Sequence, residues 1–521
     1  MSGAAPSSAM ARAQKVSVRT YETLVDVLGH RAFAAVVVGA FAFQAAWVSL
    51  SARLVIYDEE YHLLAVEAFS RHPTPFFEQT LADGELGDAE RYGSWLYHYL
   101  MSFPWRVARG LGVGYDDRVL LLRLVTVLMV AASLVVFRRL FRELGATRAV
   151  ANVAMLVVSV TPLLVFLAGA VSYDNMLMLM AALFFLSAVR LWRAETFDVG
   201  LWLSVIALGT FGSLTKYTFL PIVAFLGVVL IVRQVPHLRA IGRESRLYLA
   251  DLDRVVLTRR VALVVVALLG LALFIERYIV NLVVYGAPVP ACERVHEVEI
   301  CEIYGPWARN VALDAAYPDA SPSLSSMIGF ATNLWVPLML QYSTLIGVVD
   351  AANEPVSSTG PHVAGAILAF AVPAVLTVLL LAWGRLRAIP GVRLLLGAAA
   401  FYLLVLFGQN YLDYLTLGGA VGVAGRYALV VLPIAVGLAC IGVAQVLAAT
   451  STTGVRSVKV LLLGVLVVGL TQGGGISSYL WAAQPGWLTD DSSAVGRITL
   501  WSGDVARGGI LPNEVVRDPR F

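Results

Sequence analysis

Runs of about twenty apolar residues recur along the 521-residue chain, without the strict apolar and polar alternation of half-buried strands. A helix of about twenty apolar residues is long enough to cross the hydrocarbon core of a bilayer. Hydrophobic residues make up 59% of the sequence and charged residues 14%, a composition that suits bilayer-spanning helices. The sequence therefore predicts an all-α polytopic membrane protein, with membrane lipids as its surroundings.

The positions of Lys and Arg predict which helix ends share a side of the membrane. Basic loops such as FRRLFRELGATR and GRLRAIPGVR fall on the same side as the N-terminus, and the positive-inside rule makes that side cytoplasmic. The basic residues therefore report orientation, and the net charge of +3 gives no indication of a nucleic-acid partner. We expect about eleven spans, near 32–52, 118–137, 149–171, 175–191, 199–215, 219–232, 261–283, 363–383, 394–408, 427–449 and 458–475.

The same topology divides the chain into five parts. The apolar run 326–349 is interpreted as re-entrant or as lying at the outer surface, because a full span there would place Arg385, Arg387 and Arg393 outside. Cys292 and Cys301 share an outer loop, where a disulfide is chemically possible. The expected parts are a cytoplasmic tail at 1–31, a transmembrane module at 32–283 with a large outer loop at 53–117, an outer loop at 284–362, transmembrane helices at 363–475 and an outer tail at 476–521.

Acidic residues gather on the predicted outer side, first in the segment DEEYH at 58–62. If this segment is helical, Asp58 and His62 project from one face, and an acid and an imidazole could face a common cavity. The alternative is a solvated acidic cluster at a helix N-terminus, stabilised by the macrodipole. Asp174 and Asn175 lie in the tight turn SYDN, where they could belong to a site or form a helix N-cap.

Cationic residues also lie near the outer ends of predicted spans. Lys216 has no neighbouring acid in the sequence, so it must either snorkel outward or meet an anion. Arg426 follows a glycine that permits close backbone approach, and it could hold a phosphate bidentately or anchor the helix at the interface. Arg91 and His98, in RYGSWLYHY, are weaker candidates for a site. We therefore expect the chemistry at the outer interface and not along a path through the bilayer.

These features together resemble the GT-C glycosyltransferase superfamily, most closely the branch of protein O-mannosyltransferases and bacterial aminoarabinose transferases. The resemblance lies in an Asp-Glu pair after the first span, a large outer loop with interfacial helices, a second Asp before the fourth helix and a later Lys. DEEYH is similar to the D-E-x-x-H signature of related bacterial membrane proteins, and GRYALVVLP at 425–433 is similar to their G-R-Y segment. Tyr57, where those relatives often have proline, and RYGSWLYHY, in place of a Pro-Pro segment, depart from the pattern.

The resemblance implies a GT-C-like fold and an inverting transfer of a sugar from a polyprenyl-phosphate donor to an outward-facing glycan, lipid or protein. The site would then face the outside, most simply at a bacterial plasma membrane. A phosphate leaves without being protonated, so a single carboxylate can suffice as base, and Asp58 is the expected base. Cations would stabilise the phosphate charge. The other expected donor- or acceptor-binding residues are Glu59, His62, Asp174, Asn175, Lys216, Arg426, Arg91, Tyr92 and His98.

Other functions remain open on the sequence alone. Acids and an imidazole at Asp58, Glu59, His62 and Asp174 could bind a divalent metal, although the resemblance implies no cofactor. Hydrophobicity and the number of spans would also suit a transporter or a flippase of lipid-linked sugars. A transporter should bury ionisable residues near the bilayer midplane, which the predicted spans do not. A scaffold without catalysis would leave DEEYH unexplained.

Overall fold

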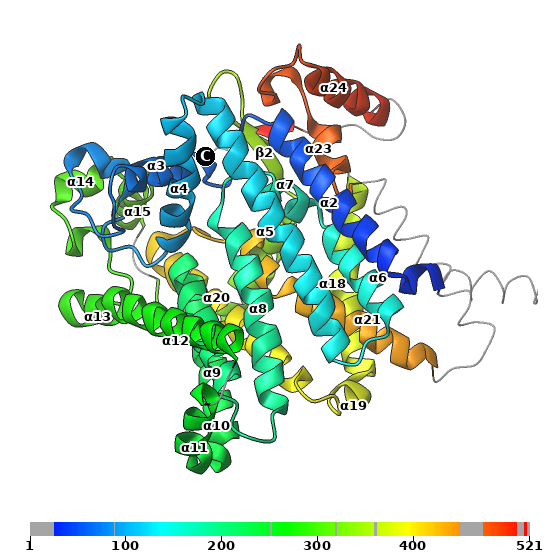
Figure 1. The fold of residues 1–521 in the computed structure, drawn as a ribbon. Helices are drawn as coiled ribbons and strands as arrows, with labels where there is room; N and C mark the ends of the chain where they lie inside the picture. Colours follow the sequence, from blue (N-terminus) through cyan, green and yellow to red (C-terminus); the bar gives the residue numbers. More distant parts are fainter. Residues whose placement is uncertain are drawn as a thin grey trace, which may run out of the picture.

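The protein is predominantly helical (Figure 1). A computed structural model describes residues 26–87, 89–250, 253–317, 320–358, 362–448, 473–507 and 515–517. Most of the expected N-terminal tail and the predicted span at 458–475, apart from its last three residues, lie outside the described residues.

Most of the long apolar runs within the described residues form single helical segments. Six helical segments are long and apolar enough to cross a membrane, and a seventh is possible if a bent pair counts as one span, so the expected number of about eleven is not confirmed. The six segments are Arg31–Ser51 (α2), Tyr115–Glu143 (α5), Tyr173–Arg193 (α8), Tyr217–His237 (which includes α10, Leu220–Gln234), Arg254–Tyr285 (α12, Arg254–Phe274, with α13, Val280–Tyr285) and Val392–Leu417 (α20).

The expected span at 149–171 is instead broken into two helices. The helices α6 (Arg148–Ser159) and α7 (Pro162–Ala168) meet at an angle of 71°. Thr161 precedes Pro162, and a residue before proline is driven out of the helical conformation by the proline ring. Thr161 accordingly has extended backbone angles, and the chain turns there. The bent pair counts as a seventh span only if it crosses the membrane as one broken helix, so the expected span at 149–171 is neither confirmed nor contradicted.

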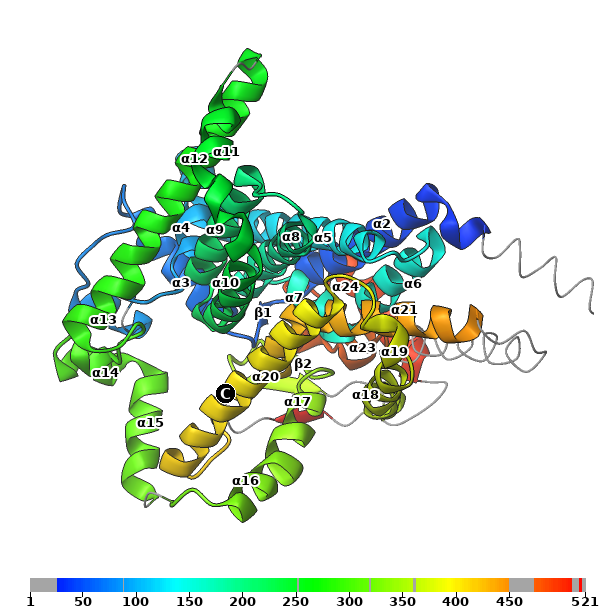
Figure 2. The same cartoon turned by 90° about the horizontal axis from the view of Figure 1, so that it is seen from below.

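The most buried of the six long segments is α8. It contacts α5 on one side and α9 (Val199–Thr215) on the other, and α9 in turn contacts α12. Seen from below, α5, α8 and α9 lie side by side, while α18 (His362–Leu381), α20 and α21 (Leu432–Ala448) form a second group (Figure 2). The short apolar lengths of α9 and α21 keep them out of the six long segments.

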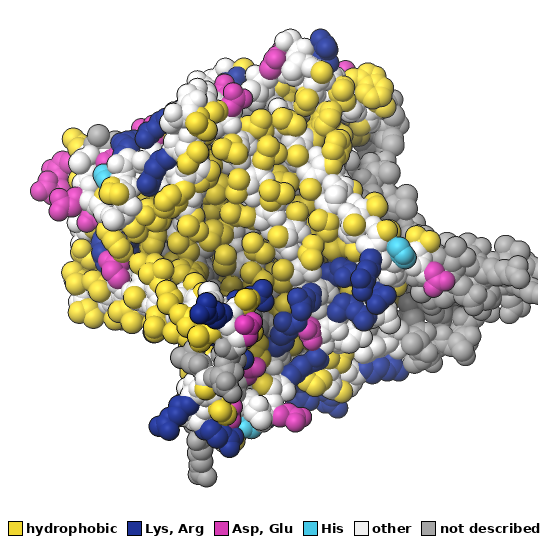
Figure 3. Space-filling model, viewed as in Figure 1, with side chains coloured by type: hydrophobic (Ala, Val, Ile, Leu, Met, Phe, Trp, Pro, Cys, Tyr) yellow, Lys and Arg dark blue, Asp and Glu magenta, His cyan; other side chains and the backbone are white. Residues whose placement is uncertain are grey.

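One face of the molecule carries a broad apolar band with Lys and Arg gathered below it (Figure 3). The C-terminal ends of α5 and α8 lie toward this basic end, and their sequences contain Arg138, Arg139, Arg142, Arg190 and Arg193. An apolar belt bordered by basic residues matches the surface of an integral membrane protein.

A small antiparallel sheet lies at the other end of the molecule, and its strand order is β1-β2-β3-β4. Strand β1 follows α2 directly and pairs with β2 through Leu54 and Val349. The run 326–349 therefore does not form one element. It supplies most of helices α16 (Leu324–Phe330) and α17 (Val336–Gln341), joined by a π-helical turn, and then strand β2. The strands are Leu54–Val55 (β1), Ile346–Val349 (β2), Pro355–Ser358 (β3) and Val515–Arg517 (β4).

A disulfide and a group of backbone hydrogen bonds fix the segments around 292–301 and 477–507. Cys292 and Cys301 form a disulfide, which the sequence had left open. The C-terminal segment with α23 (Ser477–Ala482) and α24 (Ala494–Arg507) lies against the end of α2. There the amide of Arg53 donates to the carbonyl of Trp487 at 3.0 Å, and that of Thr489 to the carbonyl of Ser51 at 2.9 Å. These hydrogen bonds hold the chain just before strand β1.

Candidate active site

Asp58 lies in the turn between β1 and helix α3 (Glu59–Ser70). Its backbone is left-handed, with φ 62° and ψ 22°, and it is one of two non-glycine residues with positive φ in the described parts of the chain. Asp tolerates this conformation better than most residues with a Cβ. Helix α3 begins only at Glu59, so Asp58 lies outside the helix and the condition under which Asp58 and His62 would project from one helical face is not met. The turn leaves the Asp58 side chain 45% exposed.

Two acids and two cations from distant parts of the sequence meet beside this turn. Arg426 donates from Nη2 to Oδ2 of Asp58 and from Nη1 to the carbonyl of Tyr57 at 2.9 Å. Lys216 Nζ donates to Oδ1 of Asp174 at 2.6 Å. Arg426 Nε lies 3.9 Å from Oδ2 of Asp174, which joins the two ion pairs. Lys216 therefore meets an anion, and the buried side chain of Arg426 does not fit the alternative of an anchor at the membrane interface.

Helix ends place these four residues together. Asp174 lies in the first turn of α8, whose N-cap is Ser172, so the N-cap alternative for Asp174 was wrong. Lys216 follows the last residue of α9, and Arg426 lies in the short helix η7 (Gly425–Val430) before α21. A Cβ on Gly425 would come within 2.6 Å of the Met339 carbonyl oxygen, so the close backbone approach expected at this glycine is present.

Aromatic rings surround the Lys216 ammonium. Its Nζ lies 4.4 Å from the ring centroid of Tyr173 and 4.3 Å from that of Tyr427, within the range of cation–π attraction. Burial lowers the pKa of Lys216 to about 8, although the adjacent Asp174 acts in the opposite direction. Lys216 can therefore lose its charge at moderately alkaline pH.

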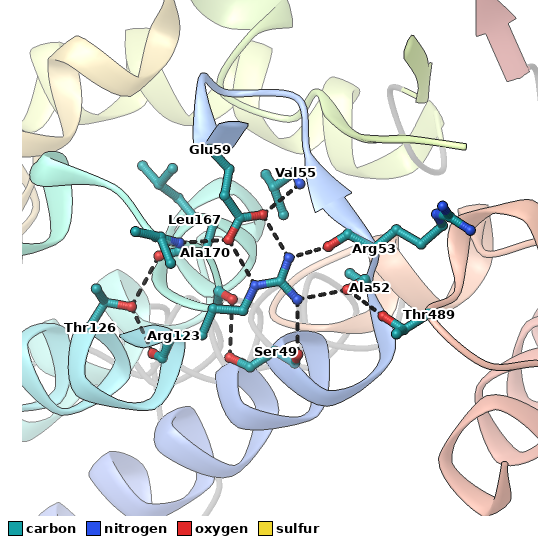
Figure 4. A network of polar contacts seen from close by, with 12 residues as sticks. Ser49, Ala52, Arg53, Val55, Glu59, Arg123, Thr126, Leu167, Ala170 and Thr489 are labelled. Atoms are coloured by element: carbon teal, nitrogen blue, oxygen red, sulfur yellow. Dashed lines mark hydrogen bonds and ion pairs between the residues drawn. The ribbon is translucent and has the colours of Figure 1, made fainter. Parts of the chain in front are cut away.

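Glu59 lies in a network of buried polar contacts (Figure 4). Its side chain is fully buried and forms a bidentate ion pair with Arg123, with both N–O distances 2.7 Å. The amides of Val55 and Val171 donate to the two oxygens at 2.7 and 2.8 Å. Each carboxylate oxygen thus accepts two hydrogen bonds. The expectation that Glu59 binds donor or acceptor was wrong, since its carboxylate is committed to the fold.

Arg123 is the structural residue that the sequence reading missed. Its guanidinium donates to the carbonyls of Ser49 and Ala52 at 3.0 and 2.7 Å and also to that of Arg53 (Figure 4). It therefore ties the end of α2 to α5 and to Glu59. The available signal was an arginine within the outer part of an apolar run, which must find a buried anion.

The histidines form a buried pair beside the acid and cation cluster. His62 Nδ1 and His98 Nε2 lie 2.8 Å apart, and the His62 ring centroid lies 4.4 Å from that of Tyr173. Burial is the main cause that lowers the pKa of His62 well below its usual value and that of His98 to about 3. Both rings are therefore neutral near pH 7, and one ring can donate a hydrogen bond to the other.

The remaining expected residues divide between structure and periphery. Asn175 donates to the carbonyls of Leu167 and Ala170, both at 2.9 Å, and so joins α7 to α8. Arg91 forms an ion pair with Glu276 at 2.8 Å beside a cavity of about 360 Å³. It is therefore not among the cations that contact Asp58 or Asp174. Tyr92 contacts Tyr217, the residue that follows Lys216, with the two ring centroids 5.9 Å apart.

The cluster suits an anion better than a metal ion. No group of three His, Cys, Asp or Glu side chains positioned to hold a metal occurs among the described residues. Buried Lys216 and Arg426 supply two positive charges and several N–H donors, and phosphate oxygens accept such charge-assisted hydrogen bonds. Beside them, Asp58 exposes a carboxylate that can take up a proton.

Several solved structures are similar to this chain at low sequence identity. No family model matches the sequence, and no curated protein matches it. ArnT from Cupriavidus metallidurans bound to undecaprenyl phosphate is 15% identical, with 91% of this chain and 69% of ArnT covered and a TM-score of 0.44. The archaeal oligosaccharyltransferase AglB from Archaeoglobus fulgidus, in complex with an inhibitory peptide and a dolichol-phosphate, is 12% identical, with 90% and 59% covered and a TM-score of 0.41.

ArnT and AglB are both GT-C glycosyltransferases, the superfamily that the sequence motifs resemble. This chain spans 59% of the length of AglB.

Proposed function

We propose that the protein is an inverting glycosyltransferase that moves a sugar from a polyprenyl-phosphate donor to an acceptor hydroxyl at the outer face of the membrane. The observation that carries this proposal is the exposed carboxylate of Asp58 beside the buried cations Lys216 and Arg426. Such a set provides a base for a hydroxyl and positive charge for a departing phosphate, the two requirements of this transfer.

The reaction needs no general acid. The acceptor oxygen forms a bond to the anomeric carbon as the bond from that carbon to the phosphate oxygen breaks, and the hydroxyl proton passes to Asp58. The bonding electrons leave with the phosphate, which Lys216 and Arg426 are placed to stabilise. A single displacement of this kind inverts the anomeric centre. Because a phosphate leaves as an anion, one carboxylate can suffice, whereas a glycosidase uses two.

The position of the site favours a lipid-linked donor. The site residues lie at or near the ends of apolar helices, at the end of the molecule away from the basic cluster of α5 and α8, with Asp174 in the first turn of α8 and Asp58, Lys216 and Arg426 in adjoining segments. By the positive-inside rule that end faces outward. A polyprenyl phosphate can reach such a site from within the bilayer, whereas soluble nucleotide sugars are cytoplasmic.

Two measurements test this proposal. Native mass spectrometry of the protein in mild detergent should detect bound undecaprenyl phosphate, and undecaprenol, which has the same chain without the phosphate, should bind more weakly. Single cysteines placed in 233–250 should be shielded from an impermeant reagent in intact cells, whereas cysteines in 485–493 should react. Equal binding of the two lipids, or labelling with the opposite sidedness, would contradict the proposal.

A further inference from the structure

The two acids and two cations of the site neutralise one another in pairs. Arg426 donates from one terminal nitrogen to Asp58 and from the other to the Tyr57 carbonyl, so both terminal nitrogens of the guanidinium already form hydrogen bonds. Asp174 takes the Lys216 ammonium. A lipid phosphate that binds Arg426 through both terminal nitrogens must therefore compete with groups of the protein itself.

The two acids differ in how easily they can give up their partner. The Asp174 side chain is 7% exposed and holds Lys216 at 2.6 Å inside the aromatic surroundings of Tyr173 and Tyr427. The Asp58 side chain is 45% exposed. Separating a buried acid from its cation leaves an uncompensated charge at high cost, whereas an exposed carboxylate can be hydrated by water. Asp58 is therefore the acid that an incoming anion can displace.

We propose that the donor's phosphate displaces Asp58 from Arg426, so that binding of the donor releases the catalytic base. This inference rests on the function proposed above and deepens it. While Arg426 holds Oδ2, that oxygen is occupied by a guanidinium donor, and an acceptor hydroxyl must compete for it. Once phosphate has taken over the guanidinium, the oxygen can accept the hydroxyl proton. The donor should therefore bind before the acceptor in the productive order.

If phosphate displaces Asp58 from Arg426, replacement of this base should strengthen the binding of the lipid phosphate. Asp58→Asn removes the negative charge that competes for Arg426, and Asn tolerates the left-handed backbone at this position. The variant should bind undecaprenyl phosphate more tightly than the wild type, by on the order of tenfold, which corresponds to release of a charge-assisted hydrogen bond. Glu60→Gln is the matched control, since it removes a neighbouring exposed negative charge without touching Arg426.

The same substitution made in an Arg426→Gln protein distinguishes displacement from simple electrostatic repulsion between Asp58 and the phosphate. In an Arg426→Gln protein there is no guanidinium to contest, so adding Asp58→Asn should give little further gain in affinity. Simple repulsion would instead give a gain at least as large in that background. The affinity of all five proteins for undecaprenyl phosphate can be measured by native mass spectrometry after equal thermal stability has been verified.

The outcomes distinguish the two proposals. A gain in the wild-type background that disappears with Arg426→Gln supports the displacement. Unchanged or weaker binding by a folded Asp58→Asn protein, or an equal gain in both backgrounds, overturns it and leaves the transferase proposal standing. Failure of the wild-type protein to bind undecaprenyl phosphate would overturn the proposed function, and this inference with it.

Discussion

Asp58 and Glu59 are neighbours in the sequence, and each pairs with an arginine, yet the structure uses them differently. Glu59 is fully buried and accepts four hydrogen bonds, two from Arg123 and two from backbone amides. Asp58 is nearly half exposed, and Arg426 holds it by a single nitrogen. The Glu59 carboxylate has all its hydrogen-bond partners within the protein and stabilises the fold. The Asp58 carboxylate remains partly accessible to solvent and can therefore take part in a reaction.

The backbone produces this division. The left-handed backbone of Asp58 forms the turn after strand β1, and helix α3 begins at the next residue. Consecutive side chains therefore leave the chain in different directions, Asp58 toward Arg426 and Glu59 inward beneath β1. Because Arg123 also holds three carbonyls at the end of α2, the buried pair fixes the segment from which Asp58 projects.

The largest expected effect is on turnover by Asp58→Asn. Loss of a general base typically lowers the rate by about a hundred- to ten-thousandfold, while the amide preserves size and the left-handed backbone. Transfer from a polyprenyl-phosphate sugar, followed by mass spectrometry of the product, would measure this effect. Turnover close to that of the wild type would remove Asp58 from the role of base.

Glu59→Gln should act mainly on stability. It leaves the buried Arg123 guanidinium without its counter-charge, and breaking a buried ion pair from one side typically costs about 3–5 kcal/mol. Thermal unfolding in detergent and the yield of folded protein should both fall. The double variant Glu59→Gln with Arg123→Met should recover part of the loss. A stable Glu59→Gln protein that has lost turnover would reverse the contrast drawn between the two acids.

Much of the helical framework could be predicted from the sequence because apolar runs of the right length have few alternatives in a bilayer. The convergence of Asp174, Lys216 and Arg426 near Asp58 could also be anticipated, since all four lie at helix ends on one side. The number of spans was not obtained in this way, because length and apolarity alone do not decide it.

The pairing of the charges could not be predicted. Glu59 and Arg123 are 64 residues apart in the sequence, and either neighbouring acid would satisfy an arginine equally well on charge alone. The choice depends on the left-handed turn at Asp58, which requires strand β1 to be fixed first by β2 and by the C-terminal segment. Such distant backbone contacts leave no local pattern in the sequence.

Lys216 supplies a smaller and pH-dependent expectation. Because burial lowers its pKa to about 8, the ammonium loses its proton as the pH rises through that value, and its hold on phosphate is lost with it. The ratio kcat/KM, which reports the free enzyme, should therefore fall above about pH 8. In Lys216→Arg this fall should move to higher pH, since a guanidinium remains charged. An unchanged alkaline limb in that variant would assign the limb to another group.

Glu60 provides the smallest effect and completes the comparison among the three consecutive acids. Its side chain is exposed in the first turn of α3, where its charge interacts with the helix dipole and with water. Neutralisation to Gln removes only that interaction, about 0.3–1 kcal/mol, and should leave turnover unchanged. Thermal unfolding and the transfer assay, run beside Asp58→Asn and Glu59→Gln, measure both quantities. If Glu60→Gln lowered turnover as strongly as Asp58→Asn, loss of a negative charge anywhere in this segment would explain the effect. The assignment of the base would then require a variant that moves the Asp58 carboxylate without removing it, such as Asp58→Glu.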